Sequence, residues 1–374
     1  MARIETLLAG TKIVDLSQYI PGPLTSLLLA DMGAEVLKIE PPQGDEMRTL
    51  GPRDAAGGPV FYQALNAGKS VLRLDLKSGE GRKTLFDHLA DADILIEGFR
   101  PGVMARLGLD FETLRPLFPR LIYCSISGYG TAGPLTKIAA HDGNYLATSG
   151  ILDRNGSGMP MFFDPPVADM SGSLFAAIAI LGALHGRATS KAGSHIDIGL
   201  ADALMPLQLL QIADYAANGT VPKPRSGYLN GAAAYYQVYA TADGRHVMLG
   251  SVERKFWSNF CAAAGRADWI ARQDEAMPQK ALIGDVALYF AKLTLDDALA
   301  QFANVDCCLS PVLDLAEALG SKQVIERGLV RAADGALQAL FPAKFDGEAA
   351  RPRAPLVDIT PAQLSEKRRK HVAR

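Results

Sequence analysis

The chain has 374 residues and a formal net charge of −2 at pH 7. Hydrophobic residues make up 48% of it and charged residues 21%, which is close to average usage in soluble globular proteins. No uninterrupted apolar run reaches the roughly 20 residues of a membrane-spanning helix. We therefore expect a soluble, cytoplasmic protein of two domains, with neither a nucleic acid nor a membrane as partner.

The cysteines do not suggest a metal or redox site. Cys124, Cys261, Cys307 and Cys308 show no Cys-x-x-Cys spacing, and two adjacent cysteines make a poor structural disulfide. We expect no metal. The basic run 367–370 is most simply a solvated chain end.

In the first half of the chain, short apolar runs alternate with helical stretches. Residues 12–16 are typical of a buried strand, a helical stretch follows at 24–32, and residues 34–40 return as a second strand. Such a βαβ unit predicts parallel pairing with a right-handed crossover. Further strands are expected at 70–76, 93–97 and 121–126, and helices at 79–89 and 103–114. This alternation predicts a doubly wound, Rossmann-like α/β domain.

The turn after the first strand lacks the dinucleotide fingerprint. A Rossmann cofactor site needs Gly-x-Gly-x-x-Gly at this point, whereas residues 17–23 read Ser-Gln-Tyr-Ile-Pro-Gly-Pro. We therefore expect neither a nicotinamide nor a flavin cofactor.

The second half begins with a predicted strand at 195–198 and a long helical stretch at 200–218. Residues 219–227 are rich in Pro, Gly and basic side chains, which is typical of a linker. A hairpin is expected at 235–250, with Asp243-Gly244 as its turn. Helices are expected at 256–263, 280–292 and 295–302. The predicted organisation is a large domain at 1–200, a linker helix and loop at 201–227, a small α+β domain at 228–320, and a C-terminal segment at 321–374 that returns to the large domain.

Two groups that can carry a proton, His141 and Asp169, flank a loop rich in Gly, Asn and Pro. Asp169 precedes the apolar run 173–181, so we expect it in or just before the first turn of a helix, where unpaired amides favour a carboxylate. From spacing alone, an ordinary N-cap aspartate explains Asp169 as well, and a structural pair explains His141 and Asp142 as well.

Several ordered segments resemble the class III coenzyme A transferase family, also called the CaiB/BaiF family, which includes formyl-CoA transferase, carnitine CoA-transferase and α-methylacyl-CoA racemase. The matching segments are 21–23, 29–45, 66–70, 74–77, 97–103 and 155–172. The resemblance implies an acyl-CoA thioester as substrate and an interlocked homodimer. Each subunit is then expected to have a Rossmann-like large domain and a smaller α+β domain.

The resemblance also implies a coenzyme A site in which cations meet phosphates and apolar groups flank the adenine. The corresponding residues are Leu74, Lys77, Phe99, Arg100, Val103 and Arg106. Many relatives place an arginine directly after the segment that ends at Glu40, where this chain has Pro41. Lys38 or Arg48 is the expected substitute, and the sequence does not decide between them.

The family contains two chemistries that use the same aspartate. In the transferases, the residue matching Asp169 is a nucleophile that forms an acyl anhydride and then an aspartyl-CoA thioester. In the racemases it is one of two bases, and the other is a histidine in a motif that matches His141, Asp142 and Asn144. A glutamate of the racemase-like branch matches Glu253, and the glycine-rich loop of formyl-CoA transferase is missing from that part of the sequence.

Inversion at the carbon next to a thioester needs one group to take a proton and another to deliver one to the opposite face. His141 and Asp169 can exchange these roles near neutral pH, and Glu253 is a candidate to hold the histidine in one tautomer. The amides of 169–172 are candidate donors to the enolate. We expect an acyl-CoA racemase or epimerase that acts on a 2-methylacyl-CoA. The alternative, a CoA-transferase, stays open because His-Asp-x-Asn-Tyr also occurs in family members that transfer CoA.

Overall fold

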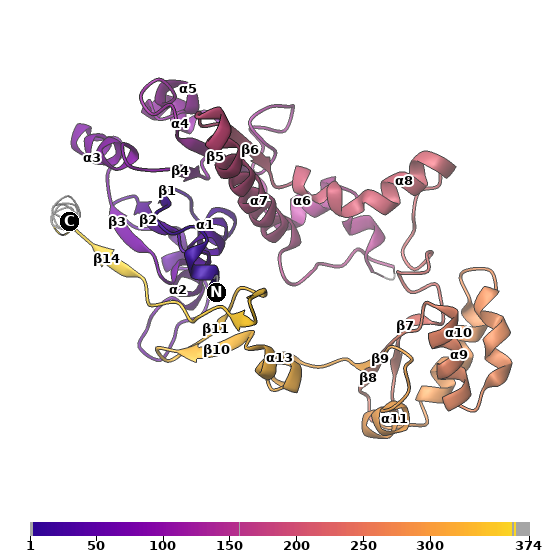
Figure 1. Cartoon of the computed structure of the whole chain (residues 1–374). Coiled ribbons are helices and arrows are strands. Elements are labelled where there is room, and N and C mark those ends of the chain that lie inside the picture. Colours follow the sequence, from indigo (N-terminus) through magenta and orange to yellow (C-terminus); the bar gives the residue numbers. More distant parts are fainter. Residues whose placement is uncertain (1–2, 157, 361–362, 364–374) are drawn as a thin grey trace. The chain divides into compact units, whose positions relative to one another are not determined.

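The computed structural model describes residues 3–156, 158–360 and 363, which form two compact units (Figure 1). The first unit comprises the described residues of Met1–Ser149, Phe163–Leu207 and Lys322–Arg374, and the second comprises those of Gly150–Phe162 and Gln208–Ser321. The chain therefore leaves the first unit twice and returns to it twice. The basic run 367–370 lies outside the described residues.

A seven-stranded sheet in the order β14-β3-β2-β1-β4-β5-β6 forms the centre of the first unit (Figure 1). Its strands are β1 (Lys12–Asp15), β2 (Glu35–Glu40), β3 (Ser70–Arg73), β4 (Ile94–Glu97), β5 (Ile122–Ser127), β6 (His195–Gly199) and β14 (Val357–Ile359). All neighbouring strands are parallel, which confirms the predicted α/β fold class. The strand order reverses between β1 and β4, and in such sheets ligands bind beyond the carboxyl ends of the strands at this point.

Helices cover both faces of this sheet. They are α1 (Pro21–Asp31), α2 (Val60–Asn66), α3 (Gly79–Leu89), α4 (Val103–Leu107), α5 (Phe111–Leu114), α6 (Asp142–Thr148) and α7 (Val167–Ser190). Leu85, Met104 and Leu114 of α3, α4 and α5 share one buried cluster with Val14 of β1. Asp15 follows Val14 on β1, so its side chain lies on the other face of the sheet. There it accepts a hydrogen bond from Ser26 of α1, and α1 packs against α7.

Among the described residues, α7 is the one helix that is long and apolar enough to cross a membrane by length and composition alone. It packs against α1, α6, β5 and β6, and Ala176 and Ile180 on it are fully buried. In this fold α7 is therefore a core helix of the first unit.

Two predicted helices differ from the structure, because single residues interrupt them. The stretch 103–114 divides into α4 and α5 at Gly108, whose φ of 67° lies in the left-handed region that ends helices. The stretch 200–218 becomes η4 (Asp202–Leu204), η5 (Pro206–Gln208) and α8 (Leu209–Asn218). Pro206 has no N–H for an α-helical hydrogen bond, so the regular helix begins only after it.

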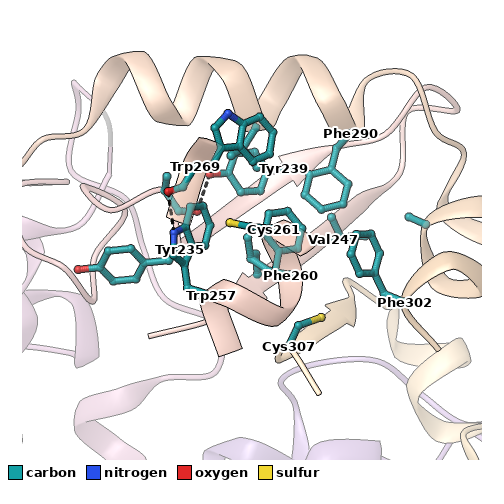
Figure 2. Packing of buried hydrophobic residues seen from close by; sticks show 14 of the residues in the cluster. Tyr235, Tyr239, Val247, Trp257, Phe260, Cys261, Trp269, Phe290, Phe302 and Cys307 are labelled. Atoms are coloured by element: carbon teal, nitrogen blue, oxygen red, sulfur yellow. Dashed lines mark hydrogen bonds between the residues drawn. The ribbon is translucent and has the colours of Figure 1, made fainter. Parts of the chain in front are cut away.

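The second unit contains an antiparallel sheet of β7 (Tyr236–Ala240), β8 (His246–Gly250) and β9 (Leu309–Pro311). Its helices are η3 (Leu152–Arg154), α8, α9 (Arg254–Ala263), η6 (Ala267–Asp274), α10 (Lys280–Phe290), α11 (Leu295–Phe302) and α12 (Leu315–Leu319). Figure 2 shows its aromatic core, in which Phe260 stacks on Trp257, Phe290 and Phe302 at centroid distances of 5.5, 5.8 and 5.3 Å. The Trp257 indole donates to the Trp269 carbonyl at 3.0 Å, so its polar atom is satisfied within the core.

The last described segment packs on the first unit. It holds α13 (Lys322–Arg327), β10 (Val330–Ala333), β11 (Ala336–Ala339), β12 (Lys344–Phe345), β13 (Glu348–Ala349) and β14, while η1 (Ile4–Thr6) and η2 (Glu46–Arg48) lie near the other end of the chain. Arg353 makes two bonds to the carboxylate of Asp31 in α1, at 2.6 and 2.7 Å. This bidentate pair and the pairing of β14 with β3 attach the segment to the large sheet.

Candidate active site

The N-termini of α6 and α7 are joined through one carboxylate. Asp142, the first residue of α6, accepts hydrogen bonds through its Oδ1 from the amides of Ala168 at 2.7 Å and Asp169 at 3.1 Å. The N-cap residue of α7 is Pro166, which has no side-chain acceptor, so Asp142 caps this helix from a different helix. A negative charge at this position is also favoured by the dipole of α7.

Asp169 is the third residue of α7 and is mostly buried. Burial, and secondarily the charge of Asp142, raises the pKa of its carboxyl to about 7. Burial disfavours the ionised form of Asp169, and the nearby charge of Asp142 adds to this effect, so the Asp169 carboxyl keeps its proton until near neutral pH. Asp169 therefore populates both its protonated and its ionised form at pH 7, which suits a group that gives and takes a proton.

His141 is the N-cap residue of α6, and its side chain is exposed. Its backbone N–H donates to Asn144 Oδ1 at 3.0 Å, and its carbonyl accepts from the Asn144 amide at 2.8 Å. The Tyr145 hydroxyl donates to the Ala140 carbonyl at 2.9 Å. These bonds fix the backbone of His141 and leave its imidazole at the surface. Because Asp142 follows His141 and binds the amide of Asp169, the three residues form one local assembly.

A glycine-rich loop at 128–133 packs on this assembly. A Cβ atom at Gly128 would lie 2.5 Å from the hydroxyl oxygen of Tyr145, so glycine is needed for this close approach. Further along, the Thr131 amide donates to both carboxylate oxygens of Asp197, at 3.1 and 3.0 Å. The loop after β5 is thus anchored to β6 and packs against Tyr145 of α6.

The first turn of α7 does not offer the enolate donors that the sequence suggested. The amides of Ala168 and Asp169 are bonded to Asp142, and the Met170 amide donates to the Pro166 carbonyl at 3.0 Å. The expectation overlooked a capping carboxylate that comes from outside the helix. We therefore assign no enolate contact to these amides.

The residues expected to bind coenzyme A lie on both sides of the point where the strand order reverses. Leu74 and Lys77 follow β3, Phe99 and Arg100 follow β4, and Val103 and Arg106 belong to α4. Lys77, Arg100 and Arg106 are exposed, whereas Leu74 is buried in the core. Since β2 and β1 separate β3 from β4, the two groups are about 14 Å apart by ordinary strand spacing.

Lys38 is not placed to meet a phosphate. Its side chain is fully buried, and its Nζ lies 2.9 Å from an oxygen of Asp45 and donates to the Ser17 carbonyl at 2.6 Å. Lys38 was expected to bind phosphate only as one of two substitutes for the arginine that Pro41 replaces. In this chain the ammonium has internal partners instead.

Arg48 is also engaged within the protein. Its guanidinium bonds to Glu40 at 2.8 Å and to Asp358 of β14 at 2.9 Å, and it lies over the ring of Tyr62 at 4.2 Å. Only 18% of its side chain is exposed. Both Lys38 and Arg48 are therefore bonded within the protein, and neither is available to bind a phosphate in place of the arginine that many relatives have at the position of Pro41.

The sequence profile of CoA-transferase family III matches residues 8–358. The chain belongs to this family. The α-methylacyl-CoA racemase of Mus musculus is 34% identical to it over 374 residues, covering 97% of this chain and 89% of that protein. The acetyl-CoA:oxalate CoA-transferase of Acetobacter aceti is 30% identical over 373 residues, covering 95% and 94%. The crystal structure of a CaiB/BaiF family protein from Brucella suis superimposes with a TM-score of 0.85 at 29% identity, covering 98% and 99%.

Family III membership establishes the class of chemistry. The family acts on CoA thioesters, and its members named above are a racemase and a CoA-transferase. This chain is therefore an enzyme of one of these two types. Among the described residues, no group of three or more His, Cys, Asp or Glu side chains is arranged to hold a metal ion.

Glu253 belongs to the second unit, whereas His141, Asp142, Asn144 and Asp169 belong to the first. Glu253 is the N-cap residue of α9; its side chain is exposed and makes no capping bond. The segment around it is anchored, because the buried Gln273 donates to the Val252 carbonyl at 2.8 Å. The structure thus brings together four of the five predicted catalytic residues and places the fifth on a firmly held turn of the other unit.

No role was predicted for Tyr145, Asp15 or Lys69 from the sequence. Tyr145 supports the backbone before His141, and burial together with the nearby charge of Asp169 raises the pKa of its phenol to about 12. Asp15 and Lys69 are fully buried and lie 3.5 Å apart. The one signal available for Asp15 was a carboxylate inside the apolar run 12–16, where a buried charge requires a partner.

Proposed function

We propose that this family III enzyme is an acyl-CoA racemase or epimerase that inverts the α-carbon of a 2-methylacyl-CoA by two-base proton transfer. The observation that supports this most directly is the carboxyl of Asp169, whose pKa is raised to about 7 by burial and by Asp142. A group with this pKa is an efficient proton acceptor and donor at neutral pH. Asp142 attaches it to the segment that carries His141, the second proton carrier.

In the proposed reaction the Asp169 carboxylate takes the α-proton, and the electrons of the C–H bond enter the thioester enolate. Protonated His141 then delivers its proton to the opposite face of the α-carbon. The cycle ends with Asp169 protonated and His141 neutral. For the other enantiomer, neutral His141 takes the α-proton and protonated Asp169 delivers one to the opposite face. Asp142 positions Asp169, Asn144 fixes the backbone of His141, and Glu253 is proposed to support the imidazole.

For the thioester itself, we propose that Lys77, Arg100 and Arg106 bind the phosphates of coenzyme A. Phe99 and Val103 would flank its adenine, whereas the expected contact of Leu74 is not proposed because this side chain is buried in the core. The exposure of the three cations and their place at the carboxyl edge of the sheet support this assignment. Lys38 is left out because of its burial.

The second candidate is a CoA-transferase, which the similarity to acetyl-CoA:oxalate CoA-transferase favours. In that reaction the Asp169 carboxylate attacks the thioester carbonyl and CoA leaves as a thiolate. The thiolate then attacks the aspartyl carbonyl of the anhydride, which releases the first acid and leaves aspartyl-CoA. We place the racemase first because a carboxyl that is partly protonated at neutral pH can both give and take a proton, whereas the transferase uses it in its ionised form alone.

One experiment separates the two functions. The enzyme is incubated with a 2-methylacyl-CoA in deuterium oxide, and separately with an acyl-CoA and a panel of carboxylic acids. We expect deuterium to enter the α-carbon without any acceptor acid. Transfer of CoA through a hydroxylamine-sensitive acyl-enzyme, without α-exchange, would replace the racemase by the transferase.

A further inference from the structure

Four charged side chains are buried together near β1, β2 and β3: Asp15 ends β1, Lys38 lies on β2, Asp45 follows β2 and Lys69 precedes β3. Asp15 pairs with Lys69 at 3.5 Å and Lys38 pairs with Asp45 at 2.9 Å, and none of the four side chains is exposed. Burying an ion costs several kcal/mol, and well-packed apolar residues would often give equal or greater stability. Stability alone is therefore a poor reason for this cluster.

Both ammonium groups also bind backbone carbonyls, Lys38 in the β1–α1 connection and Lys69 in the first turn of α1. Lys38 Nζ donates to the Ser17 carbonyl at 2.6 Å, and Lys69 Nζ donates to the Pro23 carbonyl at 2.8 Å. Asp15 accepts the Ser17 amide at 2.9 Å. The segment 17–23 is thus held by hydrogen bonds with buried charged side chains at both of its ends. This turn borders the point where the strand order reverses.

Lys38 also connects this turn to the loop after β2. Its partner Asp45 belongs to that loop and accepts the Met47 amide at 2.9 Å. Across the same gap, the hydroxyl of Tyr19 binds the carboxylate of Glu46. Tyr19 has a φ of 64°, a conformation that a bulky residue keeps only where its surroundings enforce it.

The same turn contacts the helix of Asp169. Ser173 Oγ donates to the Pro21 carbonyl at 2.9 Å and to the Asp169 carbonyl at 2.8 Å. Thr25 Oγ1 of α1 lies 3.3 Å from the Ser173 carbonyl. A shift of the turn would therefore be felt one helical turn from the proposed catalytic carboxyl.

We infer that Lys38 and Lys69 are positioning residues, which act as a buried clamp that sets the β1–α1 turn against the loop after β2 and against the start of α7. The inference rests on the proposed function in one respect, namely that the thioester binds at this edge of the sheet. Burial lowers the pKa of Lys69 to about 7, and the charge of Asp15 opposes this effect, so the charge on Lys69 depends on its pairing with Asp15. Burial raises the pKa of Asp15, but the charges of Lys38 and Lys69 outweigh it and hold that pKa below its usual value.

A pair of variants distinguishes positioning from stability. Lys38→Met leaves Asp45 as a buried, unpaired carboxylate, so both stability and affinity for the thioester should fall. Adding Asp45→Asn removes the second charge and keeps an acceptor for the Met47 amide, so stability should return toward that of the wild type. We expect the KM for the acyl-CoA to stay about tenfold above that of the wild type, equivalent to about 1.4 kcal/mol.

The matched control is Arg187→Met. Arg187 pairs with Asp93 at 2.6 Å. Asp93 directly precedes β4, so this pair lies at the amino ends of the strands, away from the proposed thioester site at their carboxyl ends. This variant should lose stability with an unchanged KM. A KM that returns to the wild-type value together with stability in Lys38→Met/Asp45→Asn would overturn the clamp.

Amide hydrogen exchange measured without ligand tests the clamp independently of substrate. The amides of 17–20 and 45–48 should exchange at least about tenfold faster in the double variant and at wild-type rates in Arg187→Met. Unchanged protection at these amides would overturn the inference. If the wild-type enzyme binds no acyl-CoA, the proposed function fails, and the exchange rates still decide whether the clamp exists.

Discussion

Asp169 makes the stability of the protein depend on pH in a direction that the structure defines. Its pKa in the folded state, about 7, lies above its ordinary value of 3.8, so the folded state binds this proton more tightly. The contribution of the group to stability is fully present below about pH 4 and is lost as the pH rises through about 7. We expect Asp169→Asn to raise the free energy of unfolding by up to about 4 kcal/mol near pH 8 and to change it little near pH 4. Urea unfolding at the two pH values measures this, and an equal effect at both would contradict the raised pKa.

Asp142 supplies both a cap and a charge, and one substitution separates the two. Asp142→Asn keeps an oxygen for the amides of Ala168 and Asp169 and removes the negative charge, so the pKa of Asp169 should fall. The acidic limb of the pH–rate profile for α-proton exchange should then move to lower pH. Asp142→Ala also removes the cap and should cost about 1 kcal/mol of stability. An acidic limb that stays in place in Asp142→Asn would show that burial alone sets the pKa.

At the residue scale, the sequence grouped residues that the structure also places together, but it did not reveal their surroundings. His141, Asp142, Asn144 and Asp169 were found from their motif, and the structure places them in one assembly. Lys38 was misjudged because its burial depends on a carboxylate and a carbonyl supplied by loops, which spacing along a strand does not reveal.

At the scale of elements, local signals predicted local structure. The hairpin of β7 and β8 was predicted because Asp243-Gly244 specifies a tight turn between two alternating strands. The predicted helices at 103–114 and 200–218 were too long, because Gly108 and Pro206 interrupt an otherwise suitable pattern. β14 escaped prediction because its three residues become a strand only by pairing with β3, far away in the sequence.

Two exposed arginines in the connection after β4 lead to a prediction for the binding of coenzyme A. Arg100→Ala and Arg106→Ala should each weaken binding of acetyl-CoA about tenfold, and the remaining affinity should depend less on salt, because an ion pair with a phosphate is lost. Calorimetry at two salt concentrations measures both effects. Lys83→Ala is the control, since this exposed lysine pairs with Asp87 on α3 and has no proposed ligand contact. If both arginine variants bind as tightly as the wild type, the proposed phosphate contacts are wrong.

At the scale of the whole molecule, the chain alternates between two units, and apolar side chains remain exposed on α7 and α8. These include Leu174, Ile178, Leu209, Leu210 and Ile212. On each unit taken by itself, exposed apolar side chains that gather on one helix often mark a protein interface. We propose a tightly associated homodimer, which the family resemblance also implies. Sedimentation velocity should show a dimer at micromolar concentration. A monomer that persists there would remove the interlocked arrangement and with it the proposed support of His141 by Glu253.

The central claim is that two different residues serve the two faces of the α-carbon. Its most direct test follows α-deuterium exchange separately for each enantiomer of a 2-methylacyl-CoA, with the wild-type enzyme and with His141→Ala. We expect the wild type to exchange both enantiomers, and His141→Ala to lose exchange of one and retain exchange of the other through Asp169. Undiminished exchange of both enantiomers by His141→Ala, or no exchange by the wild type, would contradict the two-base account.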